Sequence, residues 1–229
     1  MKEQGTIILI PSFEPDKKFI NYVQQLKNYF SSIVVVNDGS KAEYQPIFDY
    51  INQYDEVQVI GYNTNKGKGY ALKHGYKYIN DTIHNYSGII TVDCDGQHLV
   101  EDVYQIAEQL SQNDNHLIFG CRDFTQKHVP FKSKIGNTIT SILIFILYGK
   151  WLSDTQTGLR AFKKELTPFM LEIPGERFEY ETQVLISAIQ QDIQISTYPI
   201  QTIYENNNAG THYQVLEDSK RIGKVLFGQ

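Results

Sequence analysis

Cysteines and long apolar runs are scarce in this sequence. Only two of its 229 residues are cysteines, and both Cys94 and Cys121 lie in apolar, strand-like runs. So few cysteines exclude a disulfide-stapled scaffold and predict reduced thiols, with a Cys94–Cys121 disulfide as a minor alternative. No stretch reaches the roughly 18 apolar residues of a membrane span, and the N-terminal apolar run is too short for a signal peptide. The sequence therefore predicts a cytoplasmic protein.

An excess of basic charge is also missing. The chain has 21 Lys and Arg against 26 Asp and Glu, a formal net charge of -5. Such a chain has no general attraction to nucleic acid, so no nucleic-acid partner is expected, and any anionic ligand needs a local basic patch. Hydrophobic residues make up 41% and charged residues 21% of the chain, as in ordinary globular proteins. The length predicts a single domain over residues 1–229.

Short β-branched runs alternate with helical patterns in the first half of the chain. The runs predict buried strands at 6–10, 33–36, 57–60, 89–92 and 117–119. Apolar residues at helical spacing within 19–26 and 103–110 predict helices between the strands. The fold class is therefore α/β, a mostly parallel sheet flanked by helices. In such sheets, ligands bind beyond the carboxyl ends of the strands.

Two carboxylates follow the predicted strand at 89–92. Asp93, Asp95 and Gln97 occupy alternate positions, which would place their side chains on one side if the strand continued. Two carboxylates and an amide oxygen are hard ligands that suit Mg²⁺ or Mn²⁺. The alternative is an ordinary strand-end turn rich in Asp and Gly.

Polar residues also follow the other strands. Asp38 lies in an Asn-Asp-Gly-Ser segment, which a simple turn would explain, but it leaves the same predicted edge as Asp93 and is able to accept hydrogen bonds from a base or ribose. Residues 65–69 read Asn-Lys-Gly-Lys-Gly, but Leu72 stands where a dinucleotide fingerprint has its third glycine, and no P-loop is present. Lys68 in this glycine loop is expected to face a diphosphate at the start of a helix.

The second half contains an apolar stretch at 142–148, preceded by Lys127, Lys132 and Lys134. This pattern fits a helix in the membrane interface, and it fits a buried core helix about equally well. Residues 218–227 again mix basic and apolar side chains, as a second surface anchor or a solvated terminal helix would.

These residues together resemble the family 2 glycosyltransferases with the GT-A fold, and within them the polyprenyl-phosphate sugar synthases such as dolichyl-phosphate mannose synthase. The resemblance covers nearly the whole chain and rests on the order of its motifs: Ile10-Pro11-Ser12-Phe13, Asn37-Asp38-Gly39-Ser40, residues 65–71, Asp93-Cys94-Asp95-Gly96-Gln97-His98, Gly120-Cys121-Arg122, and residues 153–160.

The resemblance implies a role for each motif. It places Pro11, Ser12, Glu14 and Asp38 at the nucleoside, and it gives the metal to Asp93, Asp95 and Gln97. Arg122 and Lys132 would surround the phosphate of a lipid acceptor. Asp154 would orient the acceptor or act as a base, and Arg160 would pair with a phosphate or with Asp154. A lipid phosphate is already an anion, so its attack on the anomeric carbon needs positioning and charge neutralisation more than a base.

The resemblance also suggests the substrates and the setting. It implies an inverting enzyme of cell-envelope glycan synthesis with UDP-glucose or UDP-N-acetylglucosamine as donor and undecaprenyl phosphate as acceptor. Residues 1–122 would bind the nucleotide sugar, and residues 123–229 would face the acceptor and the membrane. The expected location is the inner face of the cell membrane, peripherally bound, with a small integral membrane protein as a partner. The oligomeric state stays open, a homo-oligomer included.

Three alternatives remain from the sequence. One is a glycosyltransferase that acts on a saccharide hydroxyl. Another is a haloacid-dehalogenase-like phosphatase, because residues 89–96 resemble the nucleophile loop of that family, although Gln97 departs from its pattern and no acidic pair stands directly after a later predicted strand. The third is an inactive module that binds a nucleotide sugar.

Overall fold

The computed structural model describes residues 2–112, 117–124, 131–201, 221 and 223–225, with the main chain alone for 131–136. Its strands and main helices follow the chain in this order: β1 (Thr6–Ser12), α1 (Lys18–Tyr29), β2 (Ile33–Asp38), α2 (Gln45–Ile51), β3 (Val57–Tyr62), α3 (Lys68–Thr82), β4 (Gly88–Thr91), α4 (Val100–Gln112), β5 (Leu117–Arg122), α5 (Phe131–Tyr148), β6 (Arg160–Lys163), α6 (Thr167–Glu172), α7 (Glu179–Gln190) and β7 (Ile195–Ile200).

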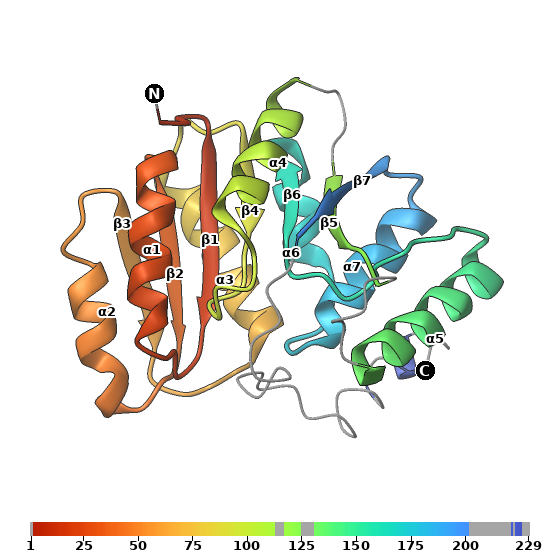
Figure 1. Ribbon diagram of the computed structural model, residues 1–229, viewed down its shortest axis with the longest axis horizontal. Helices are drawn as coiled ribbons and strands as arrows, with labels where there is room; N and C mark the ends of the chain where they lie inside the picture. Colours follow the sequence, from red (N-terminus) through yellow and green to blue (C-terminus); the bar gives the residue numbers. More distant parts are fainter. Residues whose placement is uncertain (1, 113–116, 125–130, 202–220, 222, 226–229) are drawn as a thin grey trace.

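The strands form one sheet in the order β3-β2-β1-β4-β6-β5-β7. All neighbouring pairs are parallel except those of β6, which runs antiparallel to β4 and β5. Each face of the sheet is covered by helices (Figure 1). Ile7 and Leu9 of β1 pack into a core that includes residues of α3, α6 and α7, whereas Ile8 and Ile10 pack into a second core with α1, α2 and α4. The predicted fold class is confirmed.

Several strands are longer than their apolar runs. β1, β2 and β5 continue to Ser12, Asp38 and Arg122, so these polar residues belong to the strands themselves. The sequence pattern does not predict β6 or β7, because both are short and mix polar with apolar side chains. The last residues of β1, β2 and β5 and the residues after β4 lie at one edge of the sheet, as expected for parallel strands.

Helix α5 contains the apolar stretch 142–148. Only Ile144 of this stretch is buried, whereas Ile142, Phe145, Ile146 and Leu147 are exposed. The alternative of a buried core helix is therefore wrong. No helix within the described ranges is both long enough and apolar enough to cross a membrane. Most of the segment 218–227 lies outside the described residues; positions 221 and 223–225 are helical.

A buried carboxylate fixes the loop before α3. The two oxygens of Asp38 accept hydrogen bonds from the Tyr62 hydroxyl (2.8 Å), the Asn65 amide (2.9 Å) and the main-chain N–H groups of Lys66 and Gly67 (2.8 and 2.9 Å). Gly67 has a φ of 103°, which favours glycine. Asp38 was predicted to contact the nucleoside; in the structure its oxygens hold this loop and so set the position of Lys68.

We expect the substitution Asp38→Asn to lower the free energy of unfolding by about 1–3 kcal/mol, because an amide cannot accept from all of these donors. Urea denaturation followed by circular dichroism measures this loss. The exposed Asp81→Asn variant, which breaks only a surface pair with Lys77, is the control and should unfold like the wild type. Equal stability of the two variants would contradict the loop-holding role.

Candidate active site at the carboxyl edge of the sheet

The acidic segment after β4 is a turn and not a continued strand. β4 ends at Thr91, and Cys94 and Asp95 lie in a turn, so the predicted strand alternation of Asp93, Asp95 and Gln97 is wrong. The Asp93 carboxylate is half-buried, whereas Asp95 is exposed. An oxygen of Asp95 accepts a hydrogen bond from the Gln97 main-chain N–H at 3.1 Å. The turn therefore brings the two carboxylates near each other without help from strand pleating.

Asp93 is bound by two side chains. Its Oδ1 lies 2.6 Å from the Lys68 ammonium, and its Oδ2 lies 3.3 Å from Nε2 of the buried His98. Gly158 lies directly against the carboxylate, because a Cβ built on it would meet Oδ2 of Asp93 at 2.2 Å. Lys68 also lies 3.0 Å from Oε1 of Glu181, which is buried at the start of α7.

The ionisation of this cluster follows from these contacts. Burial by itself would raise the pKa of Asp93, but the charge of Lys68 and the hydrogen bond with His98 outweigh it and hold that pKa well below its usual range. Burial likewise would lower the pKa of Lys68, but Asp93 and Glu181 outweigh it and raise it. The pKa of Asp95 is raised by loss of hydration and by the neighbouring Asp93 charge. Since Asp95 is exposed, we regard the charge of Asp93 as the more important cause.

The loop that follows β1 contacts the residues that follow β2. Pro11 and Ser12 are the last residues of β1 and are buried. The Ser12 Oγ is buried and has no ordinary hydrogen-bond partner among the described residues. Glu14 has a φ of 48°; its N–H donates to Ser40 Oγ at 2.8 Å, and its carboxylate pairs with Lys41 at 3.0 Å. The loop is thus held by its own contacts and leaves Ser12 as a buried polar group at the edge of the sheet.

Arg122 at the end of β5 is fixed by Asp154. Its Nε and Nη2 donate to the two carboxylate oxygens at 2.6 and 2.9 Å, and its main-chain N–H donates to one of them at 3.2 Å. The Gln156 N–H donates to the other oxygen at 3.1 Å. Asp154 is fully buried. With both oxygens engaged in this way, it orients Arg122 and is not placed to act as a base, so that predicted role is not supported.

Helix α5 is tied to the segment that carries Asp154. The buried Asn137 donates to the Ser153 carbonyl at 2.6 Å, and its amide oxygen accepts from the N–H and the hydroxyl of Thr155 at 2.9 and 3.1 Å. Asn137 therefore holds the residues on both sides of Asp154. Lys132 lies in the first turns of the same helix, and its side chain lies outside the described residues.

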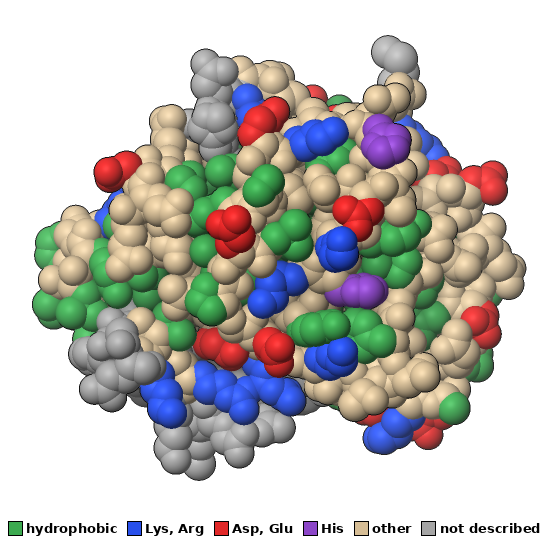
Figure 2. All heavy atoms as spheres, turned by 180° about the vertical axis from the view of Figure 1, so that it is seen from behind, with side chains coloured by type: hydrophobic (Ala, Val, Ile, Leu, Met, Phe, Trp, Pro, Cys, Tyr) green, Lys and Arg blue, Asp and Glu red, His purple; other side chains and the backbone are tan. Residues whose placement is uncertain are grey.

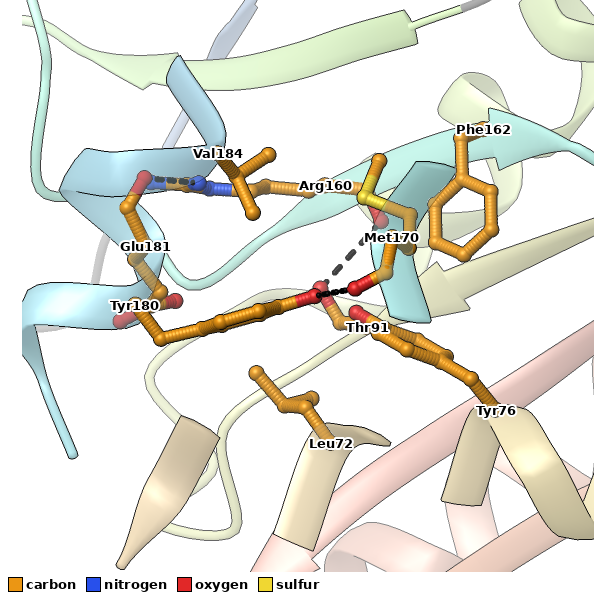
Figure 3. Close-up of a pocket in the computed structure, with 9 residues that line it drawn as sticks. All are labelled: Leu72, Tyr76, Thr91, Arg160, Phe162, Met170, Tyr180, Glu181 and Val184. Carbon is orange, nitrogen blue, oxygen red and sulfur yellow. Dashed lines mark hydrogen bonds between the residues drawn. The ribbon is translucent and has the colours of Figure 1, made fainter. Parts of the chain in front are cut away.

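Arg160 does not pair with Asp154, which corrects one of its predicted partners. Its guanidinium is buried and donates to the carbonyls of Thr157, Glu181 and Thr155 at 3.0, 2.6 and 3.5 Å. Figure 3 shows it reaching the main chain of Glu181 above a small cavity of about 10 Å³, the space of about one water molecule. Because Arg160 is buried and donates to three carbonyl groups, it holds the main chain in place and is not available to a phosphate at the edge.

Four residues that contact the site were not identified as such from the sequence. Glu181 and Asn137 were not assigned to the site, and Gly158 and His98 were named only as parts of motifs, without a particular partner. A buried Lys68 requires a carboxylate partner, but only the folded chain shows that Glu181 supplies one. Within the described ranges, no group of three or more His, Cys, Asp or Glu side chains is gathered as a metal cage. Cys94 and Cys121 are free thiols, as predicted.

Comparisons with known proteins agree with this architecture. The chain is 28% identical to the UDP-N-acetylglucosamine–dolichyl-phosphate N-acetylglucosaminyltransferase of Methanococcus voltae over 252 residues, which cover 99% of this chain and 100% of that protein. It is 23% identical to a dolichyl-phosphate beta-glucosyltransferase of Saccharomyces cerevisiae, over 84% of this chain and 65% of that protein.

Solved structures show the same fold. Glucosyl-3-phosphoglycerate synthase from Mycobacterium tuberculosis, in complex with Mn²⁺, UDP and glucosyl-3-phosphoglycerate, superposes with a TM-score of 0.74 at 12% identity, over 98% of this chain and 79% of that chain. Mannosyl-3-phosphoglycerate synthase from Rubrobacter xylanophilus superposes with a TM-score of 0.68 at 13% identity, over 98% and 72% of the two chains. These likenesses show the predicted GT-A fold.

A family model described as "Glycosyl transferase family 2" matches residues 8–169, which contain the acidic turn, Arg122 and Asp154. The match rules out the phosphatase alternative. The chain belongs to the family 2 glycosyl transferases.

Proposed function

We propose that this protein transfers a sugar from a nucleotide sugar to a polyprenyl phosphate. The observation that carries the proposal is the position of Arg122. It is held by a fully buried carboxylate at the ligand-binding edge of the sheet, and Asn137 connects this pair to a helix whose apolar side chains face outward. A positive group beside an apolar surface matches an acceptor with a phosphate head and a hydrocarbon tail.

The donor is proposed to bind on the β1–β4 side of the edge. Two carboxylates near each other at Asp93 and Asp95 suit Mg²⁺ or Mn²⁺, and the exposed Asp95 leaves room for phosphate oxygens. Such an ion would neutralise the charge that grows on the departing nucleoside diphosphate. Gln97 would add an amide oxygen. The buried Ser12 hydroxyl is a candidate for the nucleoside, with Pro11 and Glu14 beside it in the chain.

The acceptor is proposed to be a phosphate and not a sugar hydroxyl. A hydroxyl nucleophile needs a base, and the candidate Asp154 is buried and engaged by Arg122 and Gln156. A phosphate monoester is already anionic, so Arg122, with Lys132 near it in the chain, would need only to hold it in line with the anomeric carbon. Attack from the face opposite the leaving group would invert the configuration.

Helix α5 is proposed to lie on the membrane surface. Its polarity is reversed: Asn137, Thr140 and Ser141 are buried against the protein, whereas its large apolar side chains face outward. The most exposed of these are Ile139 (54%), Phe145 (52%) and Ile146 (70%), with Trp151 (57%) after the helix. Hydrophobic side chains gather at the left edge of Figure 2, the side on which α5 lies. The bilayer surface on the cytoplasmic side is the partner that this polarity fits.

The finer assignments follow the relatives. The names of the relatives from M. voltae and S. cerevisiae favour UDP-N-acetylglucosamine or UDP-glucose as donor. Undecaprenyl phosphate is proposed as the acceptor for cell-envelope glycan synthesis. Residues 1–122 would form the donor half and residues 123–229 the acceptor half. A small integral membrane protein is proposed as a partner, and a homo-oligomer as an assembly of the chain.

We expect purified protein to transfer labelled sugar from one of these donors to polyprenyl phosphate in vesicles, in the presence of Mn²⁺, with release of UDP. Arg122→Lys, which keeps the charge but removes the two-pronged pairing with Asp154, should lower kcat/KM for the lipid by about 10–100-fold while UDP binding stays nearly unchanged.

Asp95→Ala should abolish the Mn²⁺-dependent thermal stabilisation by UDP.

Three results would contradict these assignments. Binding of UDP-sugar with Mn²⁺ but no transfer to any acceptor would indicate an inactive module. Transfer to a saccharide hydroxyl would move the acceptor assignment away from phosphate. An undiminished Mn²⁺-dependent shift in Asp95→Ala would remove the metal from this turn.

The membrane assignment predicts that the double variant Phe145→Glu/Ile146→Glu loses binding to phospholipid vesicles. Keeping two large apolar side chains from the bilayer should weaken binding by at least about tenfold. Vesicle flotation measures the loss, and UDP binding should not change. Tyr50→Glu, at an exposed aromatic residue of α2 (45% exposed), is the control. Equal flotation of the double variant and the wild type would show that α5 does not meet lipid.

A further inference from the structure

Lys68 is the cation that ties the acidic turn to the second half of the chain. Its ammonium lies between Asp93 (2.6 Å) and Glu181 (3.0 Å), and its side chain is only 14% exposed. Few surface lysines are held in this way, because a long side chain gains little from an exposed pair. A largely buried ammonium with two carboxylates is strongly favoured over one with none.

The two carboxylates belong to different parts of the site. Asp93 is a proposed metal ligand, whereas Glu181 stands on α7 and has no such assignment. A divalent ion on Asp93 would place two positive charges within a few ångströms of the ammonium, and charges at this range repel each other strongly in the poorly screened interior of a protein. Lys68 and the ion therefore cannot share Asp93 at full strength.

Glu181 gives Lys68 a second position. If the ammonium leaves Asp93, it keeps a carboxylate partner and does not become an unpaired buried charge. From Glu181 it remains at the start of α3, at the place where the donor's diphosphate is proposed to lie. The ammonium would then form ion pairs with Glu181 and the diphosphate in place of Asp93.

We propose that Lys68 is an exchangeable counter-ion, which pairs with Asp93 until a divalent cation takes that carboxylate and then pairs with Glu181 and the donor's diphosphate. The inference rests on the proposed metal and donor sites. It has a direct consequence: the metal ion alone binds weakly, because it must displace Lys68, and the nucleoside diphosphate strengthens metal binding by accepting the displaced ammonium. Such a coupling is reciprocal.

The test compares Mn²⁺ binding with and without UDP, by electron paramagnetic resonance of the free ion. Lys68→Met should bind Mn²⁺ alone at least about tenfold more tightly than the wild type, because the competitor is gone. Its gain in Mn²⁺ affinity on adding UDP should be smaller than in the wild type. Lys73→Met is the matched control, since Lys73 lies on the same helix but contacts the Ile173 carbonyl and not the acidic turn; it should behave like the wild type.

A second measurement follows Lys68 in the wild type. A proton–nitrogen correlation spectrum of the lysine ammonium groups in the wild type, with Lys68 identified by its loss in Lys68→Arg, should show the Lys68 signal moving as Mg²⁺ is added. A Lys68 signal that stays in place at saturating Mg²⁺ would overturn the exchange.

The outcomes separate the two proposals. If the wild type binds Mn²⁺ together with UDP but Lys68→Met binds Mn²⁺ alone no better than the wild type, the exchange is wrong and the metal site stands. If the wild type binds no Mn²⁺ even with UDP, the proposed metal site fails and the exchange fails with it.

Discussion

The sharing of one ammonium between Asp93 and Glu181 joins the two halves of the chain. Lys68 begins α3, Asp93 follows β4 and Glu181 lies in α7, so three separate elements meet at a single charge. Buried charges are stable only with partners, and this pairing therefore fixes the distance between the acidic turn and the second half. Asp38 supports the arrangement, because it holds the loop that delivers Lys68.

Most of the large apolar side chains of α5 face outward, and several of its buried side chains are polar. In an ordinary surface helix the apolar side chains face the core, but here Asn137 and Ser141 face it and Ile146 faces out. One of the buried polar side chains, Asn137, forms hydrogen bonds with the residues on both sides of Asp154. One helix thus links an apolar exposed surface to the carboxylate that orients Arg122, and the proposed lipid-phosphate acceptor would use such a link.

The sequence was sufficient for the features that depend on local pattern. The buried β-branched runs predicted five strands and their parallel arrangement, and the polar residues at their ends do lie at one edge of the sheet. Contacts between distant segments were beyond it. Asp154 was given Arg160 as a partner because the two are close in the chain, yet the fold pairs it with Arg122 from β5. Strand alternation was extended through Asp95, although Gly96, with a φ of 73°, turns the chain there. The role of Asp38 in holding the loop before α3 was missed, because hydrogen bonds to a segment 28 residues later leave no local signal.

The segment from Asp154 to Arg160 connects the two charge centres. At its start, Asp154 orients Arg122; in its middle, Gly158 lies against the Asp93 carboxylate; at its end, Arg160 fastens the main chain at Glu181. The proposed transfer to a phosphate acceptor would have to keep the donor and acceptor phosphates apart while both approach one carbon. A short segment with a contact at each centre, seven residues long from Asp154 to Arg160, limits how far apart the two centres can lie.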